Sequence, residues 1–200
     1  MELILVRHGL PERSETHADP HLSATGHEQA KRVADWLAAD DIHGVWASNM
    51  LRAIQTAEPF AAKGGHDIRV HAGIAEFDQG RGAYIPTEQL KRENFAAWQA
   101  MAVGGHGVDM RAFQERVVAG MEDIIAAHAG ENVAVFCHGG VINVWAAHVL
   151  GVEPKVFFEA GYTSINRFIC SRAGHRSIVS LNERACTSRC HPERASLRAT

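Results

Sequence analysis

Two short apolar segments of this chain each end in His-Gly, and this repeated feature limits the folds that the chain can adopt. Residues 3–6 read Leu-Ile-Leu-Val and are followed by Arg7 and His8. Residues 133–137 read Val-Ala-Val-Phe-Cys and are followed by His138. Short apolar runs that contain branched side chains are typical of strands buried in a parallel sheet. We therefore expect two such strands, each with a histidine at its carboxyl end.

Residues that follow parallel strands meet at one edge of the sheet, where open α/β folds bind ligands. His8 and His138 can therefore come together although they lie far apart in the sequence. A helix is expected to open at Gly139, and the free N–H groups at its N-terminus attract anions. Arg7 and Arg52 are expected at the same edge, Arg52 in the first turn of a helix. Because the planar guanidinium group matches phosphate oxygens, these residues predict a site for a doubly charged oxyanion.

Strands and helices alternate along most of the chain. Further strands are expected at residues 44–47 and 68–71. Apolar residues at helical spacing predict helices over 25–39, from Asn49, over 87–101, from Asp109 and over 141–150. Residues 163–170 and 177–181 predict an antiparallel hairpin at a sheet edge. This order predicts an α/β fold, a three-layer sandwich with a mostly parallel sheet and helices on both faces.

Several helix ends carry local signals. Thr25 and Glu28 have the spacing of a capping box, so Thr25 is the expected N-cap of the first helix. Ser48 is the expected N-cap of the second helix. Pro59 is expected to kink or end that helix, because proline cannot donate a backbone hydrogen bond.

The length of 200 residues suffices for one domain with its own core. We expect this domain to cover residues 1–182 and residues 183–200 to form a flexible tail. Residues 73–108 interrupt the strand and helix alternation and are expected to form a lid-like excursion over the sheet edge. Cys186, Cys190 and His191 offer three zinc ligands without a fourth, so a zinc site in the tail is a minor alternative.

Charge and cysteine usage disfavour several classes of protein. The formal net charge is −3, and this lack of a basic excess disfavours nucleic acid or an anionic membrane as a partner. The first apolar run stops at Arg7, so neither a signal peptide nor a membrane span is expected. Four cysteines without regular spacing indicate reduced thiols and a cytoplasmic location. The sequence leaves the oligomeric state open, a homodimer included.

Four motifs together resemble one known family. Residues 6–9 read Val-Arg-His-Gly, which resembles the Arg-His-Gly signature of the histidine phosphatase superfamily, whose fold is that of phosphoglycerate mutase. Residues 22–30, 48–57 and 136–140 are similar to three further motifs of that family, in the same order and spacing. Each motif alone is moderately specific, whereas the four in order are highly specific. The resemblance covers residues 1–182.

The resemblance implies roles for the matching residues. His8 corresponds to the nucleophile, which forms a phosphohistidine. Arg7, Arg52 and His138 correspond to residues that bind the phosphoryl oxygens and stabilise their charge. Ser14 stands where relatives often carry an asparagine that contacts phosphate. These roles agree with the chemistry, since phosphoryl transfer depends mainly on in-line positioning and charge neutralisation.

The segment around Glu76 resembles the part of the family that holds the acid for the leaving oxygen. Glu76 is flanked by apolar residues, and burial raises the pKa of a carboxylic acid into the range useful near neutral pH. Asp78 lies two residues further on, and we expect it to have a small effect. The alternative is that Glu76 is a solvated loop carboxylate.

The residues and the resemblance together imply a phosphomonoesterase that acts on a small phosphorylated metabolite, with a phosphohistidine as the resemblance implies. Side-chain cations neutralise the phosphoryl group, so neither a metal nor a cofactor is expected. A phosphoglycerate mutase is the alternative, but the excursion offers only Arg81, Lys91 and Arg92 for a second phosphoryl group. A phospho-ligand-binding module without turnover is a third possibility, which the complete set of site residues disfavours. A dinuclear metal hydrolase is disfavoured because neither His-Gly turn has an adjacent carboxylate.

Overall fold

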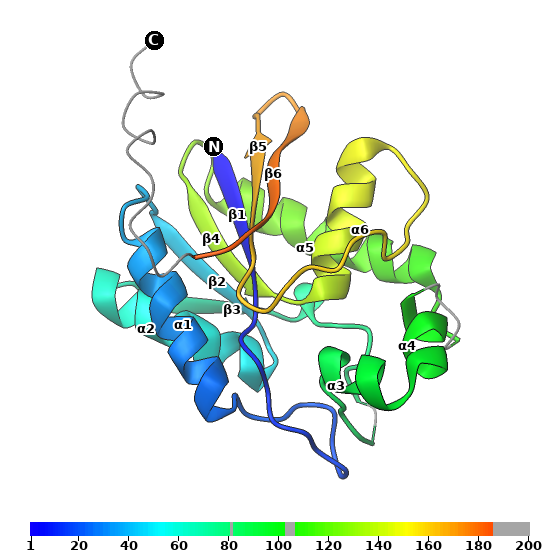
Figure 1. Cartoon of the computed structure of the whole chain (residues 1–200). Coiled ribbons are helices and arrows are strands. Elements are labelled where there is room, and N and C mark those ends of the chain that lie inside the picture. The colour runs from blue at the N-terminus through cyan, green and yellow to red at the C-terminus, as the bar shows by residue number, and fades with distance from the viewer. Residues whose placement is uncertain (81, 103–106, 186–200) are drawn as a thin grey trace.

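The computed structural model describes residues 1–80, 82–102 and 107–185, and these residues form a six-stranded sheet flanked by helices (Figure 1). The strand order is β3-β2-β4-β1-β5-β6. The strands are β1 (Glu2–Arg7), β2 (Gly44–Ser48), β3 (Ile68–His71), β4 (Val133–Cys137), β5 (Ile165–Cys170) and β6 (Arg176–Glu183). The first four strands run parallel, whereas β5 and β6 are antiparallel to their neighbours. The predicted α/β fold class and the predicted hairpin are therefore confirmed.

Helices cover both faces of the sheet, as the sequence predicts. The helices are α1 (Ala24–Leu37), α2 (Leu51–Gly64), α3 (Thr87–Glu93), α4 (Phe95–Ala102), α5 (Met110–Ala127) and α6 (Gly139–Leu150). In Figure 1, α1 and α2 lie on one side of the sheet, and α5 and α6 lie on the other. Two fully buried pairs on β1 show why, since Leu3 and Leu5 pack with α5 and α6 while Ile4 and Val6 pack with α1 and α2. Because successive strand residues point to opposite faces, one buried apolar strand supplies both cores.

The register of β1 against β4 places the two His-Gly turns side by side. Arg7 pairs with Cys137 in this register, so His8 and His138 each follow the last paired residue of its strand. The backbone N–H of His8 donates to the carbonyl oxygen of Cys137 at 2.9 Å. The carboxyl ends of the parallel strands therefore deliver both histidines to the same point.

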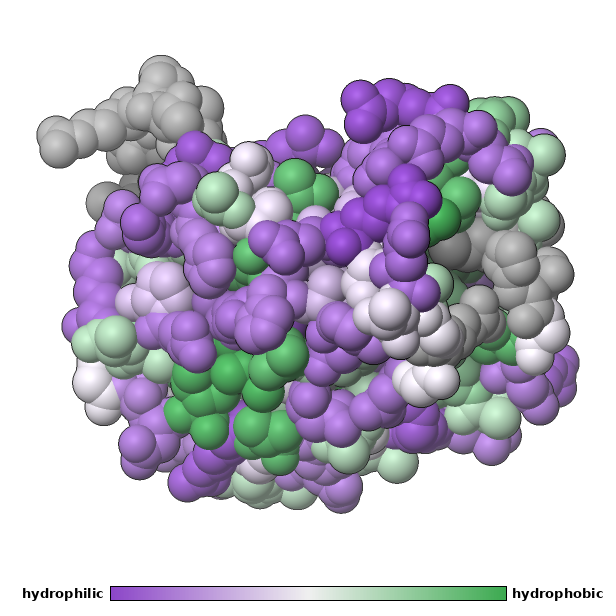
Figure 2. Space-filling view, turned by 90° about the horizontal axis from the view of Figure 1, so that it is seen from below, coloured by the Kyte–Doolittle hydropathy of each residue, from purple (hydrophilic) through white to green (hydrophobic). Residues whose placement is uncertain are grey.

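Figure 2 shows the molecule from below, the side toward which the carboxyl ends of the parallel strands point in Figure 1. The visible surface is mostly hydrophilic, and apolar side chains form separate patches on it. Among the described residues, no helix is long and apolar enough to cross a membrane.

Two expected N-caps are wrong. The N-cap of α1 is Ser23, whose Oγ accepts from the Gly26 N–H, and Glu28 pairs with Lys31 instead of reaching back toward Thr25. The helix begins two residues earlier than the capping-box spacing implies, and Ser23 also fixes the preceding loop by donating to the Leu10 carbonyl oxygen.

The second helix, α2, also differs from the expectation. Its N-cap is Met50 rather than Ser48, so Ser48 is the last residue of β2 and its hydroxyl is available for another partner. Pro59 lies inside α2, which continues to Gly64 and ends at Gly65 in the left-handed conformation. Buried residues on both sides of the proline, Ala57 and Phe60, hold the helix together through tertiary packing.

The excursion contains two helices where the sequence predicts one. Asn94 separates α3 from α4, with φ −149° and ψ 82°, and its Oδ1 accepts from the Ala97 N–H at 3.0 Å. An asparagine side chain that binds nearby backbone N–H groups favours a helix start over a helix interior. The strand β6 reaches Glu183, and the candidate zinc ligands Cys186, Cys190 and His191 lie outside the described residues.

The observed cap of α1 can be tested by stability measurements. We expect Ser23→Ala to lower the free energy of unfolding by about 0.5–2 kcal/mol, because the Gly26 N–H loses its acceptor. Thr25→Ala is the matched control and is expected to have little effect, since helix propensity favours alanine. Denaturant unfolding of both variants measures this difference, and a larger loss in Thr25→Ala would restore the capping-box interpretation.

Candidate active site

His8 and His138 lie together at the carboxyl ends of β1 and β4, both buried, with ring centroids 5.1 Å apart. His8 is held by its own turn. Its Nδ1 lies 2.8 Å from the carbonyl oxygen of Gly9, and because a carbonyl only accepts, Nδ1 carries the proton. The lone pair of His8 is therefore on Nε2, the nitrogen that a nucleophile needs free.

Burial and charge keep His8 neutral. Burial lowers the pKa of His8 well below its ordinary value, and the nearby cations Arg52 and Arg7 lower it further. A neutral imidazole retains the lone pair that attacks phosphorus. The cations that would bind an oxyanion thus also prepare His8 as a nucleophile.

Arg7 is anchored through its terminal nitrogens. Its Nη1 donates to the carbonyl oxygen of Ala160 at 2.5 Å, and Nη2 donates to Thr87 Oγ1 at 3.3 Å. Its guanidinium carbon lies 4.0 Å from the centre of the Tyr162 ring, in cation–π geometry. Its buried Nε has no hydrogen-bond partner among the described residues.

Arg52 is fully buried and is oriented by a carboxylate. Its Nη2 contacts both carboxylate oxygens of Asp78, at 2.9 and 3.2 Å, and Nη1 donates to the Ala18 carbonyl at 2.7 Å. Burial has the largest single effect and lowers the pKa of Arg52, but Asp78, Tyr84 and Glu76 together outweigh it and raise that pKa. As in Arg7, the buried Nε of Arg52 has no partner within the described part of the chain.

Ser48 orients His138. The Oγ of Ser48 lies 2.6 Å from Nε2 of His138, and the same oxygen accepts from the Met50 N–H. Burial lowers the pKa of His138 well below its usual value. Arg52 and His8 lower this pKa further, with smaller effects. The Nδ1 of His138 is buried without a partner in the described residues, as are Nε of Arg7 and Nε of Arg52. Buried polar groups usually have hydrogen-bond partners, and the oxygens of a phosphoryl group can serve as such partners.

Glu76 reaches the same point from the excursion. Its Oε2 accepts from the Gly140 N–H at 2.8 Å, at the start of α6, and Oε1 accepts from the Phe77 N–H at 3.1 Å. Burial raises the pKa of Glu76 to about 7, and the charge of Asp78 adds to the rise. A carboxyl group that is half protonated near neutral pH is suited to general acid–base chemistry. The geometry therefore excludes a solvated loop carboxylate.

Glycine is required at position 140 by this contact. A Cβ added to Gly140 would lie 2.2 Å from Oε1 of Glu76, closer than van der Waals contact allows. A Cβ on Gly139 would lie 3.6 Å from Nε of Arg7, which is an ordinary distance. The second glycine of the His138 turn thus makes room for the glutamate.

Ser14 differs from the other predicted site residues. It is partly exposed, its Oγ accepts from the N–H groups of Thr16 and His17, and it forms an isolated β-bridge with Tyr84. Ser14 and His138 do not line the cavity, whereas Gly139 does, but the ring of His138 lies beside that of His8. Ser14 therefore lies outside the group of site residues. The structure brings together the other predicted site residues, Arg7, His8, Arg52, Glu76, His138 and Gly139.

The sequence analysis did not predict the contacts that several residues make in the site. Ser48 was expected as a helix cap, but its hydroxyl contacts His138. Asp78 was expected to be minor, but it orients Arg52. Tyr84 and Tyr162 lie beneath the two guanidinium groups, at 4.7 and 4.0 Å from their centres. Only Asp78 had a signal in the sequence, namely its position two residues after Glu76.

The site opens into a cavity of about 490 Å³. Arg7, His8, Arg52 and Glu76 form its polar end, and the excursion, the first turns of α6 and the segment 156–160 form the rest of its wall. No group of three or more histidine, cysteine, aspartate or glutamate side chains is placed to hold a metal ion within residues 1–80, 82–102 and 107–185.

The comparisons with known proteins agree with this geometry. The family model of the histidine phosphatase superfamily (branch 1) matches residues 3–184. The chain belongs to this superfamily. Phosphoglycerate mutase-like protein 4 of Arabidopsis thaliana is 30% identical over 160 residues, which cover 71% of this chain and 68% of that protein. Phosphoserine phosphatase 1 of Hydrogenobacter thermophilus is 26% identical over 196 residues, 92% of this chain and 88% of that protein.

Solved structures show the same fold. A phosphoserine phosphatase of Entamoeba histolytica in complex with phosphoserine has a TM-score of 0.72 at 23% identity and covers 91% of this chain and 96% of its own. A mycobacterial glucosyl-3-phosphoglycerate phosphatase has a TM-score of 0.76 at 20% identity, with coverages of 92% and 99%. The phosphoglycerate-mutase-like fold expected from the sequence is confirmed.

The raised pKa of Glu76 has a consequence for stability. A carboxyl group whose pKa is higher in the folded state stabilises the fold below its unfolded pKa, and this contribution is lost as the pH rises through about 7. We expect Glu76→Gln to gain about 3 kcal/mol of unfolding free energy relative to the unsubstituted protein between pH 4 and pH 8.

Urea unfolding at the two pH values measures this relative gain. Any loss of unfolding free energy that glutamine causes at both pH values cancels in the comparison. Glu58→Gln, at an exposed position on α2, is the control and is expected to show no comparable change. Parallel pH profiles for Glu76→Gln and the unsubstituted protein would contradict the raised pKa.

Proposed function

We propose that this protein is a metal-independent phosphomonoesterase that hydrolyses a small phosphorylated metabolite through a phosphohistidine on His8. The observation that carries the proposal is the neutral His8, with its Nε2 free, among the cations Arg7 and Arg52 and beside a glutamate of pKa about 7. Membership of the superfamily supports phosphatase or mutase-type chemistry. The names of the relatives, which include both phosphatases and mutases, agree with this range.

In the first step, Nε2 of His8 attacks phosphorus and the bond from phosphorus to the ester oxygen breaks. Glu76 donates its proton to that oxygen, so the product leaves as an alcohol. Arg7, Arg52 and His138 bind the three remaining phosphoryl oxygens and stabilise their charge.

In the second step, water attacks the phosphohistidine. The Glu76 carboxylate now accepts a proton from the water, the bond from phosphorus to Nε2 breaks, and inorganic phosphate is released. The pKa of about 7 allows Glu76 to act as an acid in one step and as a base in the other.

A mutase would need to hold a second phosphoryl group while the intermediate reorients. Of the described residues that line the cavity, Arg7 and Arg52 are the cations, and both belong to the polar end. Lys91 pairs with Glu159 at 2.9 Å, and Arg81 lies outside the described residues. These charges favour hydrolysis over mutase activity.

The covalent step can be tested by trapping. After brief reaction with labelled substrate and denaturation, we expect acid-sensitive, alkali-stable phosphate on the peptide that contains His8. The label should be absent in His8→Ala, whereas His138→Ala should still form it slowly, since His138 binds the phosphoryl group without attacking it. Label that persists in His8→Ala but vanishes in His138→Ala would mean that the two roles are reversed.

Substrates with good and poor leaving groups can distinguish the roles of Glu76 and Asp78. An alkoxide leaves poorly without a proton, whereas a nitrophenolate leaves well. We therefore expect Glu76→Gln to slow alkyl phosphates by about 10²–10⁴-fold and aryl phosphates far less. Asp78→Asn should slow both alike, because Asp78 orients Arg52 and the phosphoryl group is common to both substrates. Equal losses on both substrates in Glu76→Gln would remove Glu76 from the acid role.

Metal independence is the third test. Arg7 and Arg52 already supply positive charge at the phosphoryl end, so we expect dialysis against a chelator to leave the hydrolysis rate unchanged. A loss of activity that zinc or magnesium restores would favour a metal hydrolase instead.

A further inference from the structure

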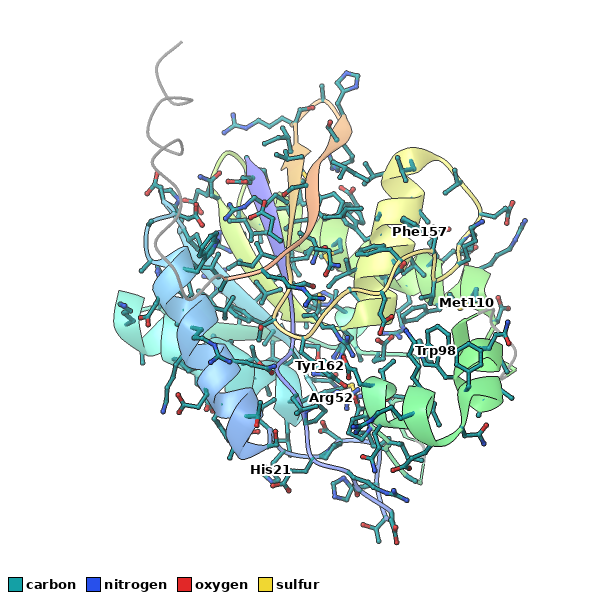
Figure 3. All side chains as sticks on the ribbon, viewed as in Figure 1. His21, Arg52, Trp98, Met110, Phe157 and Tyr162 are labelled. Atoms are coloured by element: carbon teal, nitrogen blue, oxygen red, sulfur yellow. The ribbon has the colours of Figure 1, made fainter. Side chains whose placement is uncertain are left out.

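The cavity has two ends of different chemistry. The polar end carries the candidate phosphoryl ligands, whereas the remaining described wall is mainly apolar and aromatic. Its larger apolar members are Phe77, Ile85, Leu90, Trp98, Val156 and Phe157. Figure 3 shows Trp98 on α4 and Phe157 on the segment before β5, with Arg52 and Tyr162 nearer the centre of the molecule.

The segment that carries Phe157 is fixed to the polar end. Asn143 of α6 accepts from the N–H groups of Phe157 and Phe158 with its Oδ1, at 2.9 and 3.1 Å. The amide nitrogen of Asn143 donates to the carbonyl oxygens of Gly139 and Phe158. All of the amide hydrogen-bonding groups of Asn143 thus serve to hold this wall. Arg7 adds a contact further along, through the carbonyl of Ala160.

The opposite wall is also ordered by contacts. The ring of Trp98 lies beside that of Phe95, tilted by 32° with centroids 5.3 Å apart, and Nζ of Lys91 lies 4.3 Å from the centre of the Trp98 ring. The same Lys91 is paired with Glu159. These contacts fix the position of the Trp98 ring, and Lys91 contacts both that ring and Glu159.

The charges of the described wall disfavour an anionic leaving group. Arg7 and Arg52 are both used by the phosphoryl group, and the acids that line the cavity are Glu76, Asp78 and Glu159. A carboxylate or second phosphoryl group on the leaving alcohol would lose its hydration against apolar side chains, and the nearby Lys91 is already paired with Glu159. Burying an unpaired charge in this way is costly.

We propose that the substrate is a phosphate monoester of an apolar alcohol, whose hydrocarbon part packs between Trp98 and Phe157. This inference rests on the proposed function for the position of the phosphoryl group and extends it to the substrate class. Burial of the hydrocarbon supplies binding energy in proportion to its apolar area.

Binding of n-alkylphosphonates tests the inference without turnover, because their phosphorus–carbon bond resists hydrolysis. We expect calorimetry on the full chain to show roughly three- to fourfold tighter binding for each methylene added from methyl- to hexylphosphonate. Propylphosphonate should bind more tightly than 3-phosphonopropionate, which has a similar length and a terminal carboxylate. A flat series, or tighter binding of the carboxylate, would overturn the inference.

Matched variants locate the binding surface. Trp98→Ala should weaken hexylphosphonate at least tenfold and change methylphosphonate less than twofold. Gln99→Ala, at the next and exposed position of α4, should change neither. Phe157→Ala is a second variant for the opposite wall, and retained methylphosphonate binding reports that each variant is folded. Equal loss of both ligands in Trp98→Ala and Phe157→Ala would overturn the assignment to these side chains.

Two failures are distinguishable. If ethyl phosphate is hydrolysed through a labelled His8 but the phosphonate series is flat, the proposed function stands and the apolar leaving group is wrong. If the series tightens as expected but no alkyl phosphate forms a phosphohistidine, the apolar site stands and the proposed hydrolysis fails.

Discussion

The parallel pairing of β1 with β4 is the contact on which the site depends. The N–H of His8 donates to Cys137, so the two strands end together and their histidines follow side by side. A slip of one residue would turn the side chains of β1 to the opposite faces of the sheet. The alternation of Leu3 and Ile4 between two apolar cores prevents that slip. The buried core of the domain therefore fixes the geometry of its chemistry.

Burial has opposite effects on the titratable groups that meet there. It lowers the pKa of His8 and His138 because it disfavours their cations, and it raises the pKa of Glu76 because it disfavours its anion. Arginine does not lose its proton under these conditions, so Arg52 stays charged and is compensated by Asp78. One environment thus holds neutral imidazoles, a protonatable carboxyl group and permanent cations together.

Local signals in the sequence were sufficient for most elements of the fold but not for their ends. Buried apolar runs predicted the parallel strands, and Asp109 was correctly expected to begin a helix. The cap of α1 and the break at Asn94 were missed because nearby polar residues compete for the same backbone groups. The start of α2 was missed because Met50 offers no capping side chain and the Leu51 N–H is bound by Asp19, which is distant in the sequence. Pro59 does not end α2, because tertiary packing outweighs its local cost.

The sequence by itself determined which chemical groups are present and which strand ends carry them, since apolar periodicity and His-Gly turns are local properties. It therefore predicted that Arg7, His8, Arg52 and His138 meet. Only the tertiary structure decided the pairing of Ser48 with His138 and of Asp78 with Arg52, because both join segments that are distant in the chain or loops without periodicity. The apolar character of the cavity is decided at the same level, since α4 and the segment before β5 face each other only after the chain has folded.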